Sequence, residues 1–193
     1  MISLSINEQL KDLQAWQQSV FCMALSEQSR LHFKMFCDVV ENDNAPLVDN
    51  FNQMFWDKMT LKGTKINFDI QQEHFDVLIP DARNFDFYGV YPAVDHCVIL
   101  SCAFNSFLTK SKDEALNASQ TAFSSIASFI ELQRDEEIDV QTLKTDELFV
   151  DQLTFQTQLL KLLDDQRSPD LIKSIKKFVQ DQGVTSLGIA LAD

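Results

Sequence analysis

The residues best suited to chemistry lie close together in one stretch of the sequence. Asp86, Tyr88, Tyr91, Asp95 and His96 bring carboxylates, phenols and an imidazole within a few turns of one another. Groups of these types bind small polar molecules, and they also donate and accept protons. We therefore treat residues 86–96 as the candidate ligand-binding cluster.

A helix is expected to position the second half of this cluster. Pro92 is a favoured first residue of a helix, which places Asp95 and His96 near the helix N-terminus. There the helix dipole stabilises the charged form of the Asp95 carboxyl. Asp95 also begins a face that continues with Ile99 and Cys102, so it is expected to be partly buried and to need hydrogen-bond partners.

Two interpretations of the cluster stay open at this point. It is either a pocket that binds a small ligand or handles a proton, or a hydrogen-bonded junction that pins the preceding loop to the helix. A concave surface lined by Asp86, Tyr88, Tyr91 and Asp95 would favour the first interpretation, and close packing without a cavity would favour the second.

A second group of candidate residues is acidic. Asp69, Glu73 and Asp76 recur at helical spacing and therefore share one stripe of a helix. Such a stripe binds a cation or a basic partner, or it is simply the solvated face of an amphipathic helix. Residues 131–151 are also rich in acids, and we expect a solvated loop between helices there; the alternative is a docking surface for a basic partner.

Other familiar chemistry lacks a motif. Di-iron bundles use Glu-x-x-His pairs, whereas Glu73–His74 and Asp95–His96 are adjacent pairs that point to different faces. The cysteines Cys22, Cys37, Cys97 and Cys102 do not form Cys-x-x-Cys, and neither a nucleophile elbow nor a glycine-rich phosphate loop is present. We therefore predict no metal and no cofactor, and we expect His32, like the other histidines, to lie outside any catalytic motif.

The sequence predicts that helices position these residues. Apolar residues recur at helical spacing along most of the chain, and no strand pattern is convincing. Start signals are Ser5 with Glu8, Asn44 before Pro46, Asn67, Ser111 with Glu114, and Ser168 before Pro169. They predict a first helix from about residue 6 to 24, a break near Ser29 and Arg30, and further helices over about 33–40, 47–59, 68–79, 114–130, 148–162 and 169–179.

One segment differs from the amphipathic helices. Residues 91–108 carry apolar side chains on every side, which is typical of a helix that its neighbours enclose. The fold expected is therefore all-α: a compact bundle of about seven or eight helices around this buried central helix, as a single domain over residues 1–193. The final apolar residues, 184–193, are expected to pack as an extended segment.

Composition limits the partners. The 193 residues carry a net charge of −13, which repels phosphate backbones and anionic lipid and so excludes nucleic-acid and membrane-surface binding as the favoured functions. No signal peptide or membrane span is apparent, so we expect a cytoplasmic protein with reduced thiols. The 16 phenylalanines and 4 glycines suit a core of packed aromatic rings between helices.

The sequence resembles the YjaG-type family of bacterial proteins. The resemblance rests on the run from Phe85 to Asp95, with Tyr-Gly-Val-Tyr-Pro-Ala at its centre, followed by Cys97-Val98, and on Lys65–Asp69 and Ile79-Pro80 before it. Leu13 with Trp16 and Phe21, Met35-Phe36-Cys37 and Ser186–Ile189 are similar to the family as well. The resemblance implies a compact all-α protein and no activity, because the function of that family is unknown; His74 and His96 lie outside its motif.

These observations favour a non-enzymatic cytoplasmic protein that acts by self-association, for example as a dimer, or by binding a basic protein. The alternative is a small-ligand-binding protein or enzyme that uses the cluster between Asp86 and His96. A third hypothesis, a mimic of nucleic-acid charge, requires the acids to gather on one face.

Overall fold

The computed structural model describes residues 2–109, 111–163 and 166–190. Within these ranges the chain forms helices and a single isolated antiparallel bridge between Val184 and Ala190, so the predicted all-α class is confirmed. The helices are α1 (Asn7–Asp12), α2 (Ala15–Val39), α3 (Ala45–Thr60), α4 (Phe68–Asp76), the 3-10 helix η1 (Ala82–Asn84), α5 (Val90–Leu108), α6 (Glu114–Arg134), α7 (Val140–Leu143), α8 (Glu147–Leu163) and α9 (Pro169–Gln180).

The start signals predict the helix boundaries unevenly. Ser168 and Asn67 cap α9 and α4 as expected, because their side-chain oxygens accept hydrogen bonds from Leu171 N and Ile70 N at 3.1 and 3.3 Å. The predicted cap at Ser111 is wrong, because its hydroxyl instead accepts a bond from Asp113 N and closes a turn before α6.

The first two predicted boundaries also need correction. The cap at Ser5 is wrong, since the backbone of Ile6 already enters the helical region without a side-chain cap. The expected helix over 6–24 is divided at Leu13 and Gln14, whose backbones are extended. The expected break at Ser29 is absent, and α2 continues to Val39.

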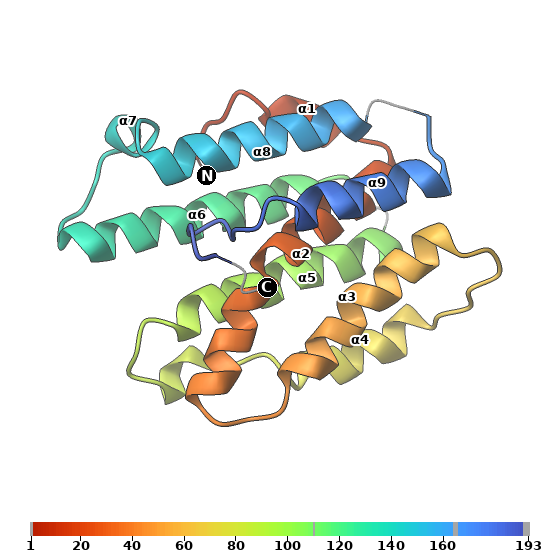
Figure 1. Ribbon diagram of the computed structural model, residues 1–193, viewed down its shortest axis with the longest axis horizontal. Helices are drawn as coiled ribbons and strands as arrows, with labels where there is room; N and C mark the ends of the chain where they lie inside the picture. Colours follow the sequence, from red (N-terminus) through yellow and green to blue (C-terminus); the bar gives the residue numbers. More distant parts are fainter. Residues whose placement is uncertain (1, 110, 164–165, 191–193) are drawn as a thin grey trace.

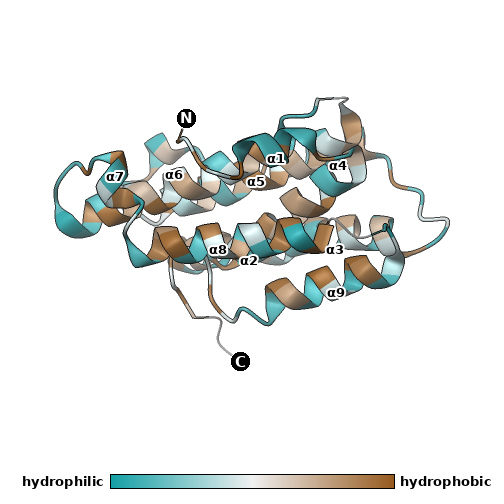
Figure 2. Cartoon of the chain, turned by 90° about the horizontal axis from the view of Figure 1, so that it is seen from above, coloured by the Kyte–Doolittle hydropathy of each residue, from teal (hydrophilic) through white to brown (hydrophobic). Residues whose placement is uncertain are grey.

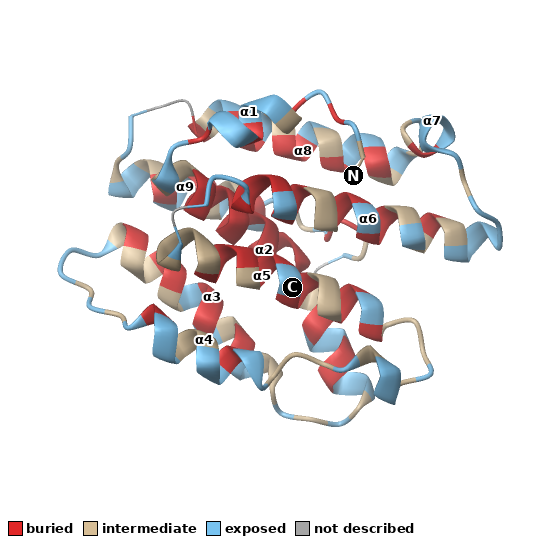
Figure 3. Cartoon of the chain, turned by 180° about the vertical axis from the view of Figure 1, so that it is seen from behind, coloured by how far each residue is buried: buried red, intermediate tan, exposed pale blue. Residues whose placement is uncertain are grey.

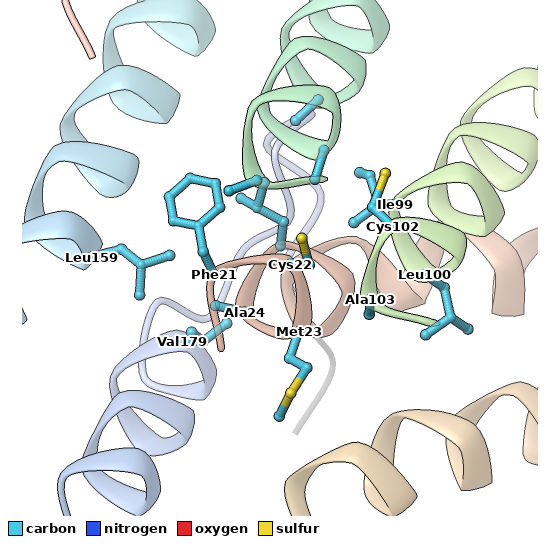
Figure 4. Close-up of a cluster of buried hydrophobic side chains, with 14 of the residues drawn as sticks. Phe21, Cys22, Met23, Ala24, Ile99, Leu100, Cys102, Ala103, Leu159 and Val179 are labelled. Carbon is cyan, nitrogen blue, oxygen red and sulfur yellow. The ribbon is translucent and has the colours of Figure 1, made fainter. Parts of the chain in front are cut away.

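Two helices share the centre of the bundle. α5 lies beside α2 and also packs against α4 and α6, whereas α2 packs against α3, α5, α6, α8 and α9. Figure 4 looks along α2 and shows neighbouring helices on every side of it, with Phe21, Met23 and Ala24 pointing in different directions. The predicted central helix is confirmed in α5, and α2 is a second one that the apolar pattern does not reveal.

Burial differs between these two helices. Residues 18–29 of α2 are buried without interruption, although they include glutamines, serines and Glu27. In α5, Ala93, Cys97 and Leu100 are fully buried, but Tyr91 and Val98 are 53% and 42% exposed. One side of α5 therefore reaches the surface, in contrast to the enclosure expected from its apolar sequence.

The buried polar groups of α2 bind four different neighbours. At least one hydrogen bond from each of four such residues joins α2 to another helix. The pairs are Gln18 Oε1 with Ala115 N of α6 at 2.9 Å, Ser26 Oγ with Asn52 Oδ1 of α3 at 2.7 Å, Glu27 with Trp56 Nε1 of α3 at 3.1 Å and with Gln180 Nε2 of α9 at 3.0 Å, and Ser29 Oγ with His96 Nδ1 of α5 at 2.9 Å.

Aromatic rings fill the space between α3, α4 and α5. The ring of Phe104 lies 4.8 Å from that of Phe55 and 5.5 Å from that of Phe75, measured between centroids, and all three side chains are fully buried. Edge-to-face and stacked geometries both occur in this cluster. The expected aromatic core is confirmed.

Outer helices such as α9 place apolar residues on one side and polar residues on the other, as Figure 2 shows.

No helix in the described part of the chain combines the length and apolar character that crossing a membrane requires.

Candidate functional site

The loop before α5 carries the first half of the candidate cluster. α5 begins at Val90, two residues before the predicted start at Pro92, because Tyr91 N donates to Tyr88 O at 2.9 Å and closes the first turn early. Gly89 precedes the helix, and a Cβ at this position would lie 3.1 Å from the Phe87 ring. The lack of a side chain at Gly89 therefore lets the loop fold closely against the helix start.

The structure brings only some of the cluster residues together. The ring of Tyr88 is half-buried, and its centroid lies 5.9 Å from Tyr91 and 6.2 Å from Phe129 of α6. Asp95 is half-buried and close enough for its charge to act on Tyr88. Asp86, in contrast, is exposed to solvent.

His96 belongs to a different environment from the tyrosines. Its side chain is fully buried, and Nδ1 lies 2.9 Å from the Ser29 hydroxyl of α2. Burial, with the nearby His32 and Arg30 adding to it, lowers the pKa of His96 to about 3. The pKa of His32 on α2 is lowered to about 4 by burial. Both imidazoles are therefore neutral at pH 7, and the contact between Ser29 and His96 joins α2 to α5.

The pKa values of Tyr88 and Asp95 are raised, whereas those of the two histidines are lowered. Burial and the negative charge of Asp95 raise the pKa of Tyr88 to about 12. Burial also raises the pKa of the Asp95 carboxyl, while the Ser125 hydroxyl of α6 acts against that rise. General acid–base catalysis is most efficient with a pKa near the working pH, and the shifts of Tyr88, His32 and His96 lead away from it.

A hollow does lie at this junction, and its lining is apolar. It measures about 210 Å³ and includes Tyr88, whereas the other predicted cluster residues do not line it. We call it the apolar groove. Its walls are His32, Met35, Phe36 and Val39 of α2, Phe87, Tyr88 and Gly89 of the loop, Pro92 of α5, Phe129 of α6, and Leu187 and Ile189 of the tail.

The α2 wall of the groove is the part that we did not predict. His32, Met35, Phe36 and Val39 follow the spacing i, i+3, i+4, i+7, which defines one face of a helix. Met35 and Val39 are 43% and 64% exposed. The helical spacing of these four residues is a sequence signal from which this wall could have been predicted.

The acidic stripe lies where its pattern indicates. Asp69, Glu73 and Asp76 are all exposed on α4, and Phe68 and Phe75 on the other face are buried. Within residues 2–109, 111–163 and 166–190, no set of three or more His, Cys, Asp or Glu side chains is arranged to hold a metal ion. Binding of a basic partner by the stripe stays a prediction.

The acidic segment 131–151 is more ordered than the expected loop. It includes the end of α6, all of α7 and the start of α8. Arg134 pairs with Asp146 at 2.8 Å, and Glu131 accepts a hydrogen bond from Ile138 N at 3.3 Å. Part of its negative charge therefore stabilises the turn between α6 and α8.

The cysteines are poor nucleophiles in this fold. All four are free and buried, as expected for core residues. Burial raises the pKa of Cys102 to about 12 and also raises the pKa values of Cys22, Cys37 and Cys97. Because the thiolate is the reactive form, these side chains act as small apolar groups.

Comparisons with known proteins agree with the resemblance seen in the sequence. The family model described as "Protein of unknown function (DUF416)" matches residues 5–190. The uncharacterized protein YjaG of Salmonella typhimurium is 31% identical over 192 residues, and YjaG of Escherichia coli K12 is 30% identical, with 98% of each chain covered in both cases. An uncharacterized protein of Haemophilus influenzae is 29% identical, covering 95% of this chain and 96% of its own.

A crystal structure shows the same fold. It is that of a DUF416 family protein from Shewanella baltica, which superposes with a TM-score of 0.89 at 22% identity, over 98% of this chain and 100% of that one.

Proposed function

The chain belongs to the DUF416 family of proteins of unknown function, and from this premise we propose that it is a non-enzymatic cytoplasmic protein that acts by binding another protein. The proposed partner presents a basic, amphipathic helical segment, which docks in the apolar groove. The observation that carries this proposal is the exposed α2 wall, where Met35 and Val39 extend an apolar face out of the core and into solvent.

The shape of the groove suits an apolar helix face. A groove-bound helix contributes anchors at i, i+3, i+4 and i+7 spacing, and the α2 wall offers a complementary ridge with that same period. Phe87, Tyr88 and Phe129 add aromatic surface, and aromatic residues are enriched where proteins bind one another.

The net charge of the chain favours a basic partner. The exposed acids Asp38 and Asp86 are next in sequence to the groove residues Val39 and Phe87, and the charge of Asp95 acts on Tyr88. The exposed Lys34 is next in sequence to Met35. The whole chain carries −13, so a second copy approaches against electrostatic repulsion and a basic segment is attracted. We therefore favour a basic partner over self-association.

The pKa values support a binding role over catalysis. The imidazoles of His32 and His96 are held neutral by burial, and the thiols of Cys97 and Cys102 are held protonated. Unpaired buried thiols are also typical of a reducing compartment, which supports the cytoplasmic part of the proposal.

A defined peptide tests the proposal. The probe is a fluorescent 18-residue helical peptide of leucine and lysine with its leucines on one face, titrated with the full chain by fluorescence anisotropy. We expect binding that weakens as salt rises from 50 to 500 mM, because salt screens the attraction between the acidic side chains of the protein and the lysines of the peptide. Val39→Asp is expected to weaken binding about ten-fold or more, since desolvating a carboxylate on the apolar groove wall costs more than its attraction to the peptide lysines contributes.

Controls separate groove binding from general attraction. Val150→Asp changes an apolar residue of α8 that is 44% exposed and lies outside the groove, so it is expected to leave the affinity within about two-fold of the unaltered chain. A leucine–glutamate peptide of the same length should bind far more weakly. Equal binding of the acidic peptide, or equal loss in both variants, would overturn the proposal.

Sedimentation velocity tests the rival occupant. The proposal predicts a monomer at micromolar concentration. A dimer that Val39→Asp dissociates would instead make a second copy the occupant and would contradict the choice of a basic partner.

A further inference from the structure

A second hollow lies on the other side of the C-terminal tail from the apolar groove. The tail is residues 183–190; its Leu187 and Ile189 line the groove, whereas Thr185, Ser186 and Gly188 line the second hollow. We call this hollow of about 240 Å³ the tail pocket. Its other walls are Gln28 of α2, Leu148, Asp151, Gln152, Thr154, Phe155 and Gln158 of α8, and Gln182 and Val184.

The tail is held in place by a compact turn. Thr185 N donates to Ile189 O at 2.9 Å, and the Thr185 hydroxyl accepts bonds from the amides of Leu187 and Ile189 at 3.3 Å. Gly188 has a positive φ of 72°, and a Cβ there would lie 3.1 Å from Leu148 Cδ2. The tail is thus a shaped wall that depends on a glycine at position 188.

Gln152 is the unusual residue of this pocket. Its side chain is 2% exposed, and neither Oε1 nor Nε2 has a hydrogen-bond partner within the described part of the chain. Leaving both polar atoms of a buried amide unpaired is costly, so native proteins rarely do it unless a water or ligand satisfies them. The last torsion of a glutamine is broad, so either Oε1 or Nε2 can face an occupant of the pocket.

The other walls define the chemistry of that occupant. Gln28 and Ser186 are each 7% exposed and add uncharged donors and acceptors beside Gln152. Asp151 is the only charged residue among the lining side chains, so an anion such as a phosphate ester is disfavoured. The ring of Phe155, stacked on Phe178 at 5.6 Å, supplies a rigid flat surface.

We propose that the tail pocket binds a small, uncharged planar amide, with its adjacent donor and acceptor paired to the Gln152 amide and its ring against Phe155. Free nucleobases and aromatic carboxamides share this chemistry. The hollow has room for one such ring, because its volume is about that of eight water molecules at roughly 30 Å³ each. This site is independent of protein binding in the apolar groove.

Titration of the full chain with uracil, hypoxanthine and nicotinamide, followed by amide NMR shifts, tests the proposal. We expect at least one of these probes to bind and to shift amides of α8 and residues 183–190. Tighter binding of uracil or hypoxanthine would identify a nucleobase as the ligand, and tighter binding of nicotinamide would identify an aromatic carboxamide. 1,3-Dimethyluracil, which lacks the N–H donors, is expected to bind at least about ten-fold more weakly than uracil.

Two glutamine variants make the test specific. Gln152→Met keeps the shape of the side chain, and we expect it to weaken binding about ten-fold while leaving the melting temperature unchanged or higher, since it removes unpaired buried atoms. Gln156→Met, one turn along α8, replaces a buried glutamine that bonds Ser119 at 2.6 Å and lies outside the pocket, so binding should persist. Absence of any binding up to 10 mM, or unchanged binding by Gln152→Met, would overturn the proposal.

Discussion

α2 and α5 lie side by side at the centre of the bundle, yet they are buried in different ways. α5 is apolar on every side and still exposes Tyr91 and Val98, whereas residues 18–29 of α2 are buried throughout although several are polar. The difference follows from the neighbours, because α2 is enclosed by five helices and α5 leaves one side open. The apolar content of a helix therefore indicates that the helix packs in the core. It does not indicate how completely other helices surround it.

The polar residues of α2 explain how a helix can be so enclosed and still be specific. Gln18 bonds α6, Ser26 bonds α3, and Glu27 bonds both α3 and α9. An apolar face packs acceptably against many partners, whereas a buried hydrogen bond is satisfied only by the correct one. We infer that these bonds determine which helix lies on each side of α2.

The largest effect is expected from placing the same acid in the middle of each helix. Ala24 of α2 is fully buried, so Ala24→Asp should lower the free energy of unfolding by about 4 kcal/mol or more, since it buries an unpaired charge. Val98 of α5 is 42% exposed, and Val98→Asp should change it by no more than about 0.5 kcal/mol. Urea unfolding followed by circular dichroism measures both.

If Ala24→Asp does not fold, Ala24→Val provides a milder comparison. It is expected to cost about 1–3 kcal/mol through overpacking. Similar losses for Ala24→Val and Val98→Asp would remove the contrast between the helices.

Acid should destabilise the contact between α2 and α5. Burial holds the pKa values of His32 and His96 at about 4 and about 3, below their ordinary 6.5. Between pH 6.5 and 4 the unfolded chain therefore binds protons that the folded chain does not. The stability contributed by each imidazole is complete above pH 6.5 and falls by about 1.4 kcal/mol per pH unit as the pH drops through that window.

Urea unfolding curves at pH 7, 6, 5 and 4.5 measure how the free energy of unfolding changes with pH. The raised pKa of Asp95 acts in the opposite direction, because the folded state takes up that proton first. His96→Gln should make the slope shallower, and a slope unchanged by this variant would show that His96 does not contribute.

Removing the buried carboxylate of α2 should cost less than burying a new one. Glu27→Ala leaves Trp56 Nε1 and Gln180 Nε2 without their acceptor, and we expect a loss of about 3 kcal/mol. Glu27→Gln keeps an acceptor and should cost about half as much. Glu8→Ala, which removes an exposed ion pair with Lys11, is the control and should cost less than about 0.5 kcal/mol. Equal effects of Glu27→Ala and Glu8→Ala would contradict the role given to α2.

The smallest effect separates two serines. Ser26→Ala breaks a buried bond to Asn52 of α3 and should cost about 1 kcal/mol. Within the described residues, Ser101 of α5 bonds only to Cys97 O of its own helix, at 2.9 Å, and it is half-buried. Ser101→Ala should therefore cost a few tenths of a kcal/mol at most. Thermal unfolding of the two variants in parallel resolves the difference, and a larger loss for Ser101→Ala would reverse the comparison.

Local signals predicted the starts of α4 and α9 correctly, whereas the similar signals at Ser5 and Ser111 failed. Ser168 and Asn67 are caps whose hydrogen bonds lie within three residues, so their sequence context is sufficient. The predicted break at Ser29 is absent because the polar residues of this segment are buried and hydrogen-bonded in α2. Their partners, such as His96 and Asn52, lie on other helices, so no local pattern reveals that they are satisfied.

The candidate site was predicted in part for a similar reason. Tyr88 does line a groove, and the loop before α5 does form one wall of it. The second wall, with Met35 and Val39, has a helical period that was readable, whereas the wall formed by Leu187 and Ile189 depends on how the tail folds across the bundle. Gln152 carries no sequence signal, because only the folded structure shows that its amide is buried and unpaired.

Native-state amide hydrogen exchange tests the enclosure of α2 most directly. If α2 is the most enclosed helix, amides of residues 18–29 exchange only through global unfolding, with a free energy equal to that from urea, and residues 90–98 of α5 open at lower free energy. Slower exchange in α5 than in residues 18–29 would contradict the account and make α5 the true centre of the fold.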